Sequence, residues 1–347
     1  MNSRERVQRS IRHESVDRTP YYHFAVPSVQ TALAEHLGFR LGDDESILQA
    51  LDVDVRYVSP RLAQVPGEAR HTYQCGAVHA RMHNAPGGEE PIAFPVGGAS
   101  TVEELDGWCW PDPDWFDYSI PTASVEAWGD RAVVAYDMGI LFLYAMGVRG
   151  MEAIMLDMAG DPPIAHTIFT RIADFNYERS RRFLEANRGV IDILGIGDDV
   201  AGQAGMVISP EMWREFLKPH VQRMVDLCDE FSVAPYFHGC GGFRALYPDF
   251  IQMGIPCTGK LQTEAKGNSL CEIKEEFGAD LCLWGAIDAQ HVVIEGAQDQ
   301  VRAHVRQVLD IGSRNSGFVA GPTHSFTEDT PIENILAVYE VLAGSSP

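Results

Sequence analysis

Apolar and polar positions follow a regular pattern through the second half of the chain. Short apolar runs rich in valine, isoleucine and leucine alternate with amphipathic stretches whose apolar residues recur every three or four positions. In the stretch 161–184, Ile164, Ile168, Ile172 and Phe175 lie on one helical stripe. Strands that alternate in this way with helices of about 10–15 residues indicate parallel βαβ units.

The pattern predicts most of the elements with definite limits. We expect strands at 132–137, 190–197, 233–238, 255–262, 280–288 and 317–322. We expect helices at 161–184, 241–254, 269–278, 297–312 and 331–344, and one that begins after Ser209 with Pro210 in its first turn. The first half predicts a helix at 3–12, an apolar run at 21–26, a helix and a strand within 43–60, and a β-hairpin at 72–95. Roughly eight βα units can be counted, which fits a closed barrel, although a doubly wound open sheet fits the same pattern.

Composition narrows the class of protein. The chain has 347 residues and is 45% hydrophobic, enough for one large core. It contains no linker-like or low-complexity segment, so we expect a single domain over 1–347. The net charge of −22 would repel a phosphate backbone and an anionic membrane surface, which argues against nucleic acid and membranes as partners.

The first residues, the longest apolar run and the cysteines indicate the cellular compartment of the protein. The first ten residues are charged and have no apolar signal-peptide core behind them. The apolar run 132–148 is interrupted by Asp137 and is too short to span a bilayer. Seven scattered cysteines, an odd number, indicate reduced thiols. We therefore expect a cytoplasmic protein.

Polar residues follow each of the late predicted strands. Catalytic groups of parallel barrels come from the carboxyl ends of strands, so these residues could face one shared pocket. In chain order they are Asp198, Asp199, His238, Cys240, Gln262, Glu264, Asp288 and His324.

His238 and Cys240 stand two positions apart. In an extended chain both side chains lie on one face, close enough to share a metal ion. Zinc suits an imidazole and a thiolate together, although chance and packing can produce the same spacing. Asp198 and Asp199 could bind metal, orient a histidine or take up a proton, and an ordinary acidic turn is the alternative for them. Nucleotide cofactors are disfavoured because no glycine-rich phosphate loop is present.

Several stretches resemble the uroporphyrinogen-decarboxylase-like superfamily. They are SRERVQRSIRHESVDRTP at 3–20, GDDVAGQAGMVISPEMWREFLKPH at 197–220, YFHGCGGFRALYPDFIQMGI at 236–255, LCLWGAIDAQ at 281–290 and GFVAGPTHSFTEDTPIENILAVYE at 317–340. The resemblance covers most of the chain and implies a single (β/α)8 TIM barrel, here with an N-terminal helical segment and a decorating β-hairpin. The superfamily includes a cofactor-free decarboxylase and zinc-dependent methyltransferases that move methyl groups between corrinoid proteins and thiols.

Two departures from the family patterns bear on the branch. The arginine-rich motif that grips uroporphyrinogen in the decarboxylase is replaced here by TPYYHFAVPSVQ at 19–30, which contains no arginine. An octacarboxylate needs many cations, so uroporphyrinogen is not the expected substrate. His238 and Cys240 match the first part of the methyltransferase zinc motif, and His324 stands where that branch has a later cysteine, which implies a His/Cys/His site.

The leading interpretation is a zinc-dependent methyltransferase or demethylase that acts on a small molecule. The resemblance implies a corrinoid protein or cofactor as the methyl partner. Asp198 or Asp199 would orient a ligand or handle a proton, and Gln262, Glu264 and Asp288 would line the substrate pocket. A metal-free decarboxylase or lyase with His324 as proton donor is the alternative, and a barrel that binds without catalysis is a third.

Overall fold

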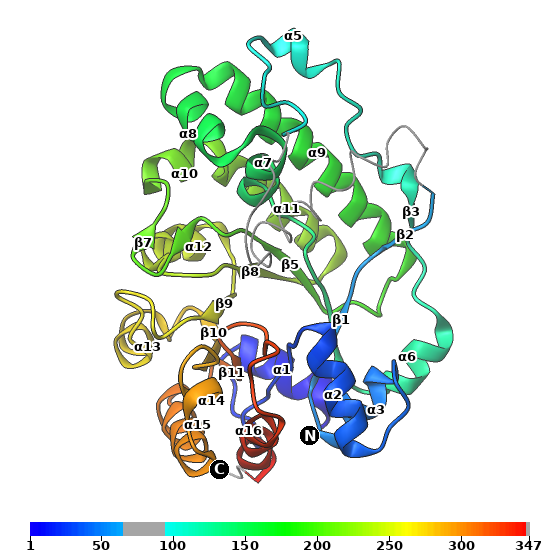
Figure 1. Cartoon of the computed structure of the whole chain (residues 1–347), viewed down its shortest axis with the longest axis vertical. Coiled ribbons are helices and arrows are strands. Elements are labelled where there is room, and N and C mark those ends of the chain that lie inside the picture. Colours follow the sequence, from blue (N-terminus) through cyan, green and yellow to red (C-terminus); the bar gives the residue numbers. More distant parts are fainter. Residues whose placement is uncertain (65–93, 345–347) are drawn as a thin grey trace.

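A computed structural model describes residues 1–64 and 94–344 of the chain. The hairpin predicted at 72–95 lies almost entirely outside the described residues. The predicted α/β alternation is confirmed in the described part, where strands run through the middle of the molecule and helices lie outside them (Figure 1).

Seven parallel strands form the central sheet in the order β1-β4-β5-β8-β9-β10-β11. This curled, all-parallel sheet is a TIM-like arrangement and confirms the predicted class. The strands are β1 Val55–Val58, β4 Ala132–Ala135, β5 Ile193–Gly197, β8 Ala234–His238, β9 Cys257–Leu261, β10 Cys282–Ile287 and β11 Phe318–Pro322.

The extended segment 20–26, which follows the first helix, links the two edges of this sheet. Tyr22 N donates to Ala320 O at 3.0 Å, and Ala320 N donates to Pro20 O at 2.9 Å, beside β11. On the other side, Asp54 N donates to Tyr21 O at 3.1 Å, directly before β1. The described strands of the sheet number seven, so the eight-stranded count stays a prediction.

The helices cover the outside of the sheet. They are α1 Ser3–Ile11, α2 Pro27–Leu37, α3 Asp44–Ala50, α5 Val102–Leu105, α6 Thr122–Trp128, α7 Phe142–Arg149, α8 Met151–Gly160, α9 Pro162–Ala186, α10 Pro210–Phe216, α11 Lys218–Phe231, α12 Tyr247–Met253, α13 Leu270–Phe277, α14 Val292–Glu295, α15 Gln298–Gly312 and α16 Ile332–Gly344. Short elements decorate the loops: β2 Arg61–Leu62 pairs with β3 Phe116–Asp117, β6 Ala201–Gly202 pairs with β7 Gly205–Met206, and the 3-10 turns are Pro113–Trp115 and Arg244–Leu246. No helix in the described ranges is long and apolar enough to cross a membrane.

Alternate residues of each strand pack into two different cores. Val134, Ile193 and Tyr236 belong to a core inside the curl, whereas their neighbours Val133 and Leu194 pack outward against the helices. This is the period of two that β-strands impose. Val7 and Ile11 of α1 join the inner core beside residues that begin strands, so α1 covers the amino ends.

Candidate functional site at the carboxyl ends of the strands

Three potential metal ligands meet where β5 and β8 end. Asp199 follows β5, His238 is the last residue of β8, and Cys240 lies two residues further on. One ligand atom from each of the three lies within 4.8 Å of the others. Cys240 N also donates to Asp199 Oδ1 at 3.0 Å, and His238 Nε2 is 3.9 Å from the same oxygen. The structure thus brings together three of the residues named from the sequence.

A close approach of the two strand ends makes this grouping possible. Gly197, which ends β5, lies opposite His238 and has a φ of 143°. A Cβ at this position would lie 2.2 Å from the His238 carbonyl oxygen. Only glycine fits such a contact without backbone movement.

The protonation states of these ligands suit a metal. Burial, and then the charge of Lys260, lower the pKa of His238 to about 4, so the imidazole is neutral at pH 7. His238 Nδ1 is buried and has no hydrogen-bond partner in the part of the chain that the structure describes. Burial and the Asp199 carboxylate raise the pKa of Cys240, and a bound cation would offset that effect. The oxygen, nitrogen and sulfur donors are ligands that zinc accepts.

Asp198 has a different environment from its neighbour. Its carboxylate accepts hydrogen bonds from the backbone N–H groups of Leu141, Phe142 and Leu143, where α7 begins. The side chain is buried, and desolvation raises its pKa to about 6 in spite of these donors. Asp198 therefore holds the start of α7 against the end of β5, as the cap of a helix N-terminus does.

Gln262, Glu264 and Asp288 lie at the ends of β9 and β10 and support loops. Gln262 Oε1 accepts from Gly241 N at 2.7 Å, which fixes the loop that carries Cys240. Glu264 Oε1 accepts from the hydroxyl of Thr323 at 3.0 Å. Asp288 Oδ1 accepts from the backbone N–H groups of residues 290 and 291, both at 2.9 Å.

His324 follows β11 and is exposed. Its charge lowers the pKa of His238, so the two imidazoles face the same region. Within the described residues, however, the group at ligand spacing consists of Asp199, His238 and Cys240 and does not include His324.

Sequence reasoning missed two ionisable residues of this region. Lys260 in β9 is 3% exposed, and burial lowers its pKa to about 7, partly offset by Cys240, Asp137 and Asp199. Asp137 follows β4, with a φ of 57°, and desolvation raises its pKa to about 6. A lysine inside the apolar run 255–262 and a carboxylate as the last residue of the predicted strand 132–137 were the available signals.

Three aromatic rings stand beside these groups. Phe24 comes from the extended segment after Pro20, Tyr57 from β1 and Tyr136 from the end of β4. Their ring centroids are 5.3–5.5 Å apart, and Tyr136 also lies 5.6 Å from the His238 ring. All three side chains are half-buried, so the strand ends present an apolar wall that reaches solvent.

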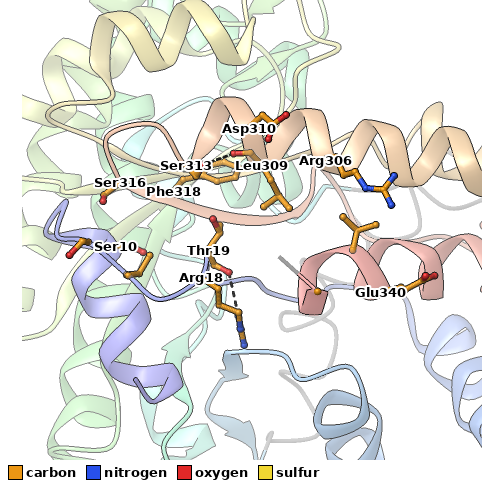
Figure 2. Close-up of a pocket in the computed structure, with 15 residues that line it drawn as sticks. Ser10, Arg18, Thr19, Arg306, Leu309, Asp310, Ser313, Ser316, Phe318 and Glu340 are labelled. Atoms are coloured by element: carbon orange, nitrogen blue, oxygen red, sulfur yellow. Dashed lines mark hydrogen bonds between the residues drawn. The ribbon is translucent and has the colours of Figure 1, made fainter. Parts of the chain in front are cut away.

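A cavity of about 640 Å³ lies elsewhere in the molecule, between α1, α15 and α16 (Figure 2). Its lining includes Ser10, Ser313 and Phe318. Phe318 begins β11, so this cavity is at the amino end of that strand. Arg18 at its edge is already paired with Asp52 and Asp54. The cavity holds none of the strand-end residues described above.

The fold and site define a TIM-like α/β protein with a polar cluster at the carboxyl edge of its sheet. The family model described as uroporphyrinogen decarboxylase (URO-D) matches residues 140–344, more than half of the chain. The chain therefore belongs to the URO-D family, which confirms the resemblance seen in the sequence.

A solved structure shares the fold at low sequence identity, and a second one resembles the chain more weakly. A methyltransferase from Methanosarcina mazei superposes with a TM-score of 0.64 at 15% identity, over 99% of both chains. A protein assigned as a vitamin-B12-independent methionine synthase from Listeria monocytogenes gives a TM-score of 0.43 at 12% identity, over 95% of this chain and 98% of that one. No curated protein matches the chain.

Proposed function

We propose that this protein is a zinc-dependent methyltransferase or demethylase that acts on a small molecule. The observation that carries the proposal is the convergence of Asp199, His238 and Cys240 within 4.8 Å at the carboxyl edge of the sheet. Three protein ligands and an open fourth position are the usual arrangement of a catalytic zinc site. The fold shared with a methyltransferase agrees with this reading.

The roles of the residues follow from their surroundings. His238 would bind through a ring nitrogen that already lacks a hydrogen, Cys240 through its sulfur and Asp199 through a carboxylate oxygen. When bound, zinc supplies Lewis acidity toward the substrate heteroatom that gives or receives the methyl group. Asp198 and Gln262 position the ligands, because one fixes the end of β5 and the other fixes the loop after β8.

In this proposal His324 lies beside the metal site. It is not one of the three ligands that lie within 4.8 Å of one another. Because it is exposed and faces His238, it can act on the substrate as a proton donor, which leaves the fourth position of the metal open. We propose a corrinoid methyl partner on the family relation alone. The extended segment 20–26 forms backbone hydrogen bonds with β11 and with the residue before β1. We propose that it takes the place of the eighth strand in a single barrel domain.

A metal-free decarboxylase or lyase is the second candidate, and one observation favours it. Asp137 and Lys260 interact electrostatically, with pKa values of about 6 and about 7. Such values suit groups that exchange protons near neutral pH. Proton transfer by this pair would need no metal.

Metal analysis separates the two candidates. We expect untagged wild-type protein to hold about one zinc per chain, and Cys240→Ser to hold at least tenfold less, since a hydroxyl replaces a thiolate. Cys271→Ser, which changes a thiol on α13, is the matched control and should keep the metal. His324→Ala should keep most of the metal and lose activity. Wild-type protein without stoichiometric metal, together with fully active Cys240→Ser, would replace the zinc proposal by the metal-free one.

A further inference from the structure

The lysine in β9 is buried, although no anionic group of the described residues pairs with its ammonium. Lys260 is 3% exposed, and burying an ammonium is unfavourable unless an anion and hydrogen bonds accompany it. Its Nζ lies 3.0 Å from the centroid of the Phe24 ring and 5.5 Å from that of Tyr136. In the described part of the chain, Nζ makes no ion pair and donates no hydrogen bond.

The aromatic contacts do not replace an anion. The face of a phenyl ring attracts a cation, but more weakly than a carboxylate at hydrogen-bond distance does. Asp137, Asp199 and Cys240 raise the pKa of Lys260 through their charges, yet none of the three lies within ion-pair distance of it. The ammonium donors are thus left for a group that the described residues do not supply.

The other two lysines with little exposure, Lys218 and Lys274, have hydrogen-bond partners, and Lys266 is exposed to solvent. Lys218 Nζ donates to Asp249 Oδ1 at 2.8 Å and to Gln252 Oε1 at 2.9 Å. Lys274 Nζ donates to the backbone oxygens of Ser316 and Gly317, the latter at 3.1 Å. Among the four lysines of the chain, Lys260 therefore differs from Lys218 and Lys274, because its side chain is buried and its ammonium has no oxygen partner in the described residues.

We propose that Lys260 binds the anionic group of the substrate, and that the substrate is a compact carboxylic acid with a flat apolar body. The carboxylate would receive hydrogen bonds from Nζ, and the body would lie against the half-buried rings of Phe24 and Tyr136. This inference rests on the proposed function, since it places the reacting heteroatom toward Asp199, His238 and Cys240. With zinc present, the charges of Asp199 and Cys240 are neutralised and no longer oppose an anion.

Benzoate is the probe for this site, with benzamide as its neutral counterpart and benzylamine as its cationic one. Calorimetry on zinc-loaded, full-length protein should show benzoate binding at least tenfold more tightly than benzamide. Lys260→Met should weaken benzoate binding at least tenfold and leave benzamide unchanged. Lys260→Arg should retain part of the affinity, and Lys218→Met should behave as wild type.

The outcomes decide the inference separately from the proposed function. Equal binding of benzoate to wild type and Lys260→Met, or preference for benzylamine, would overturn it. Loss of zinc from a folded Lys260→Met variant would also overturn it, because Lys260 would then support the metal. If wild-type protein holds no zinc but binds benzoate through Lys260, the proposed function fails while the anion site stands.

Discussion

Replacing Lys260 by methionine should make the protein more stable. The lysine pKa falls from 10.5 to about 7 on folding, and a tenfold change in proton affinity is worth about 1.4 kcal/mol. The folded state is therefore destabilised by about 5 kcal/mol at pH values below 7. Loss of the contact with Phe24 removes about 1–2 kcal/mol of favourable interaction. The net expectation at pH 6 is a gain of about 3–4 kcal/mol in the free energy of unfolding.

The sign of the pH dependence makes this prediction specific. Because the folded-state pKa lies below the unfolded value, the destabilisation is fully present below about pH 7 and disappears as the pH rises to 10.5. Thermal and urea unfolding of wild type and Lys260→Met at pH 6 and pH 10 should show a gain that shrinks at the higher pH. Lys218→Met, which removes an ion pair with Asp249, should show no gain at either pH. A Lys260→Met variant less stable than wild type at pH 6 would mean that the fold already neutralises the ammonium.

Two further expectations follow from the site. Asp198→Ala should lower the free energy of unfolding, measured in urea, by about 2–4 kcal/mol, because three backbone N–H groups at the start of α7 lose their acceptor. The folded variant should keep its metal. Metal loss without destabilisation would make Asp198 a metal ligand instead. Uroporphyrinogen should not be decarboxylated at a measurable rate, because the segment 19–30, which includes Tyr22 and Phe24, has no arginine to bind its carboxylates. Lys260 offers only one cation to an octacarboxylate. Coproporphyrinogen formed at the rate of an authentic decarboxylase would contradict this expectation.

The positions of the late strands and helices were predictable because the pattern of apolar residues in each element matches the way that the element is buried. The run 280–288 became β10 Cys282–Ile287, and the amphipathic stretch 161–184 became α9 Pro162–Ala186. Both patterns reflect packing that every residue of the element shares. The elements between 94 and 131 are short, and their apolar residues have no clear period, so the sequence predicted none of them.

The site was predictable only where spacing within one strand decides geometry. His238 and Cys240 are two apart on one chain segment, so their proximity follows from the period of the strand. Which of Asp198 and Asp199 joins them depends on where α7 begins, a contact between residues more than 50 positions apart. Lys260 and Phe24 meet only because the extended segment 20–26 returns to the sheet beside β11, and no local pattern contains that contact.

The polar groups at the carboxyl edge divide into those that the fold satisfies and those that it does not. Asp198, Asp288 and Gln262 receive backbone N–H groups and hold loops in place. His238 Nδ1 is buried without a hydrogen-bond partner, and the side chain of Lys260, which is 3% exposed, makes no ion pair or hydrogen bond within the described residues. An unsatisfied buried group lowers stability, and a bound ion or ligand is one reason why a fold retains it. A cation beside His238 and an anion beside Lys260 would satisfy both groups, and each would strengthen the other because their charges are opposite.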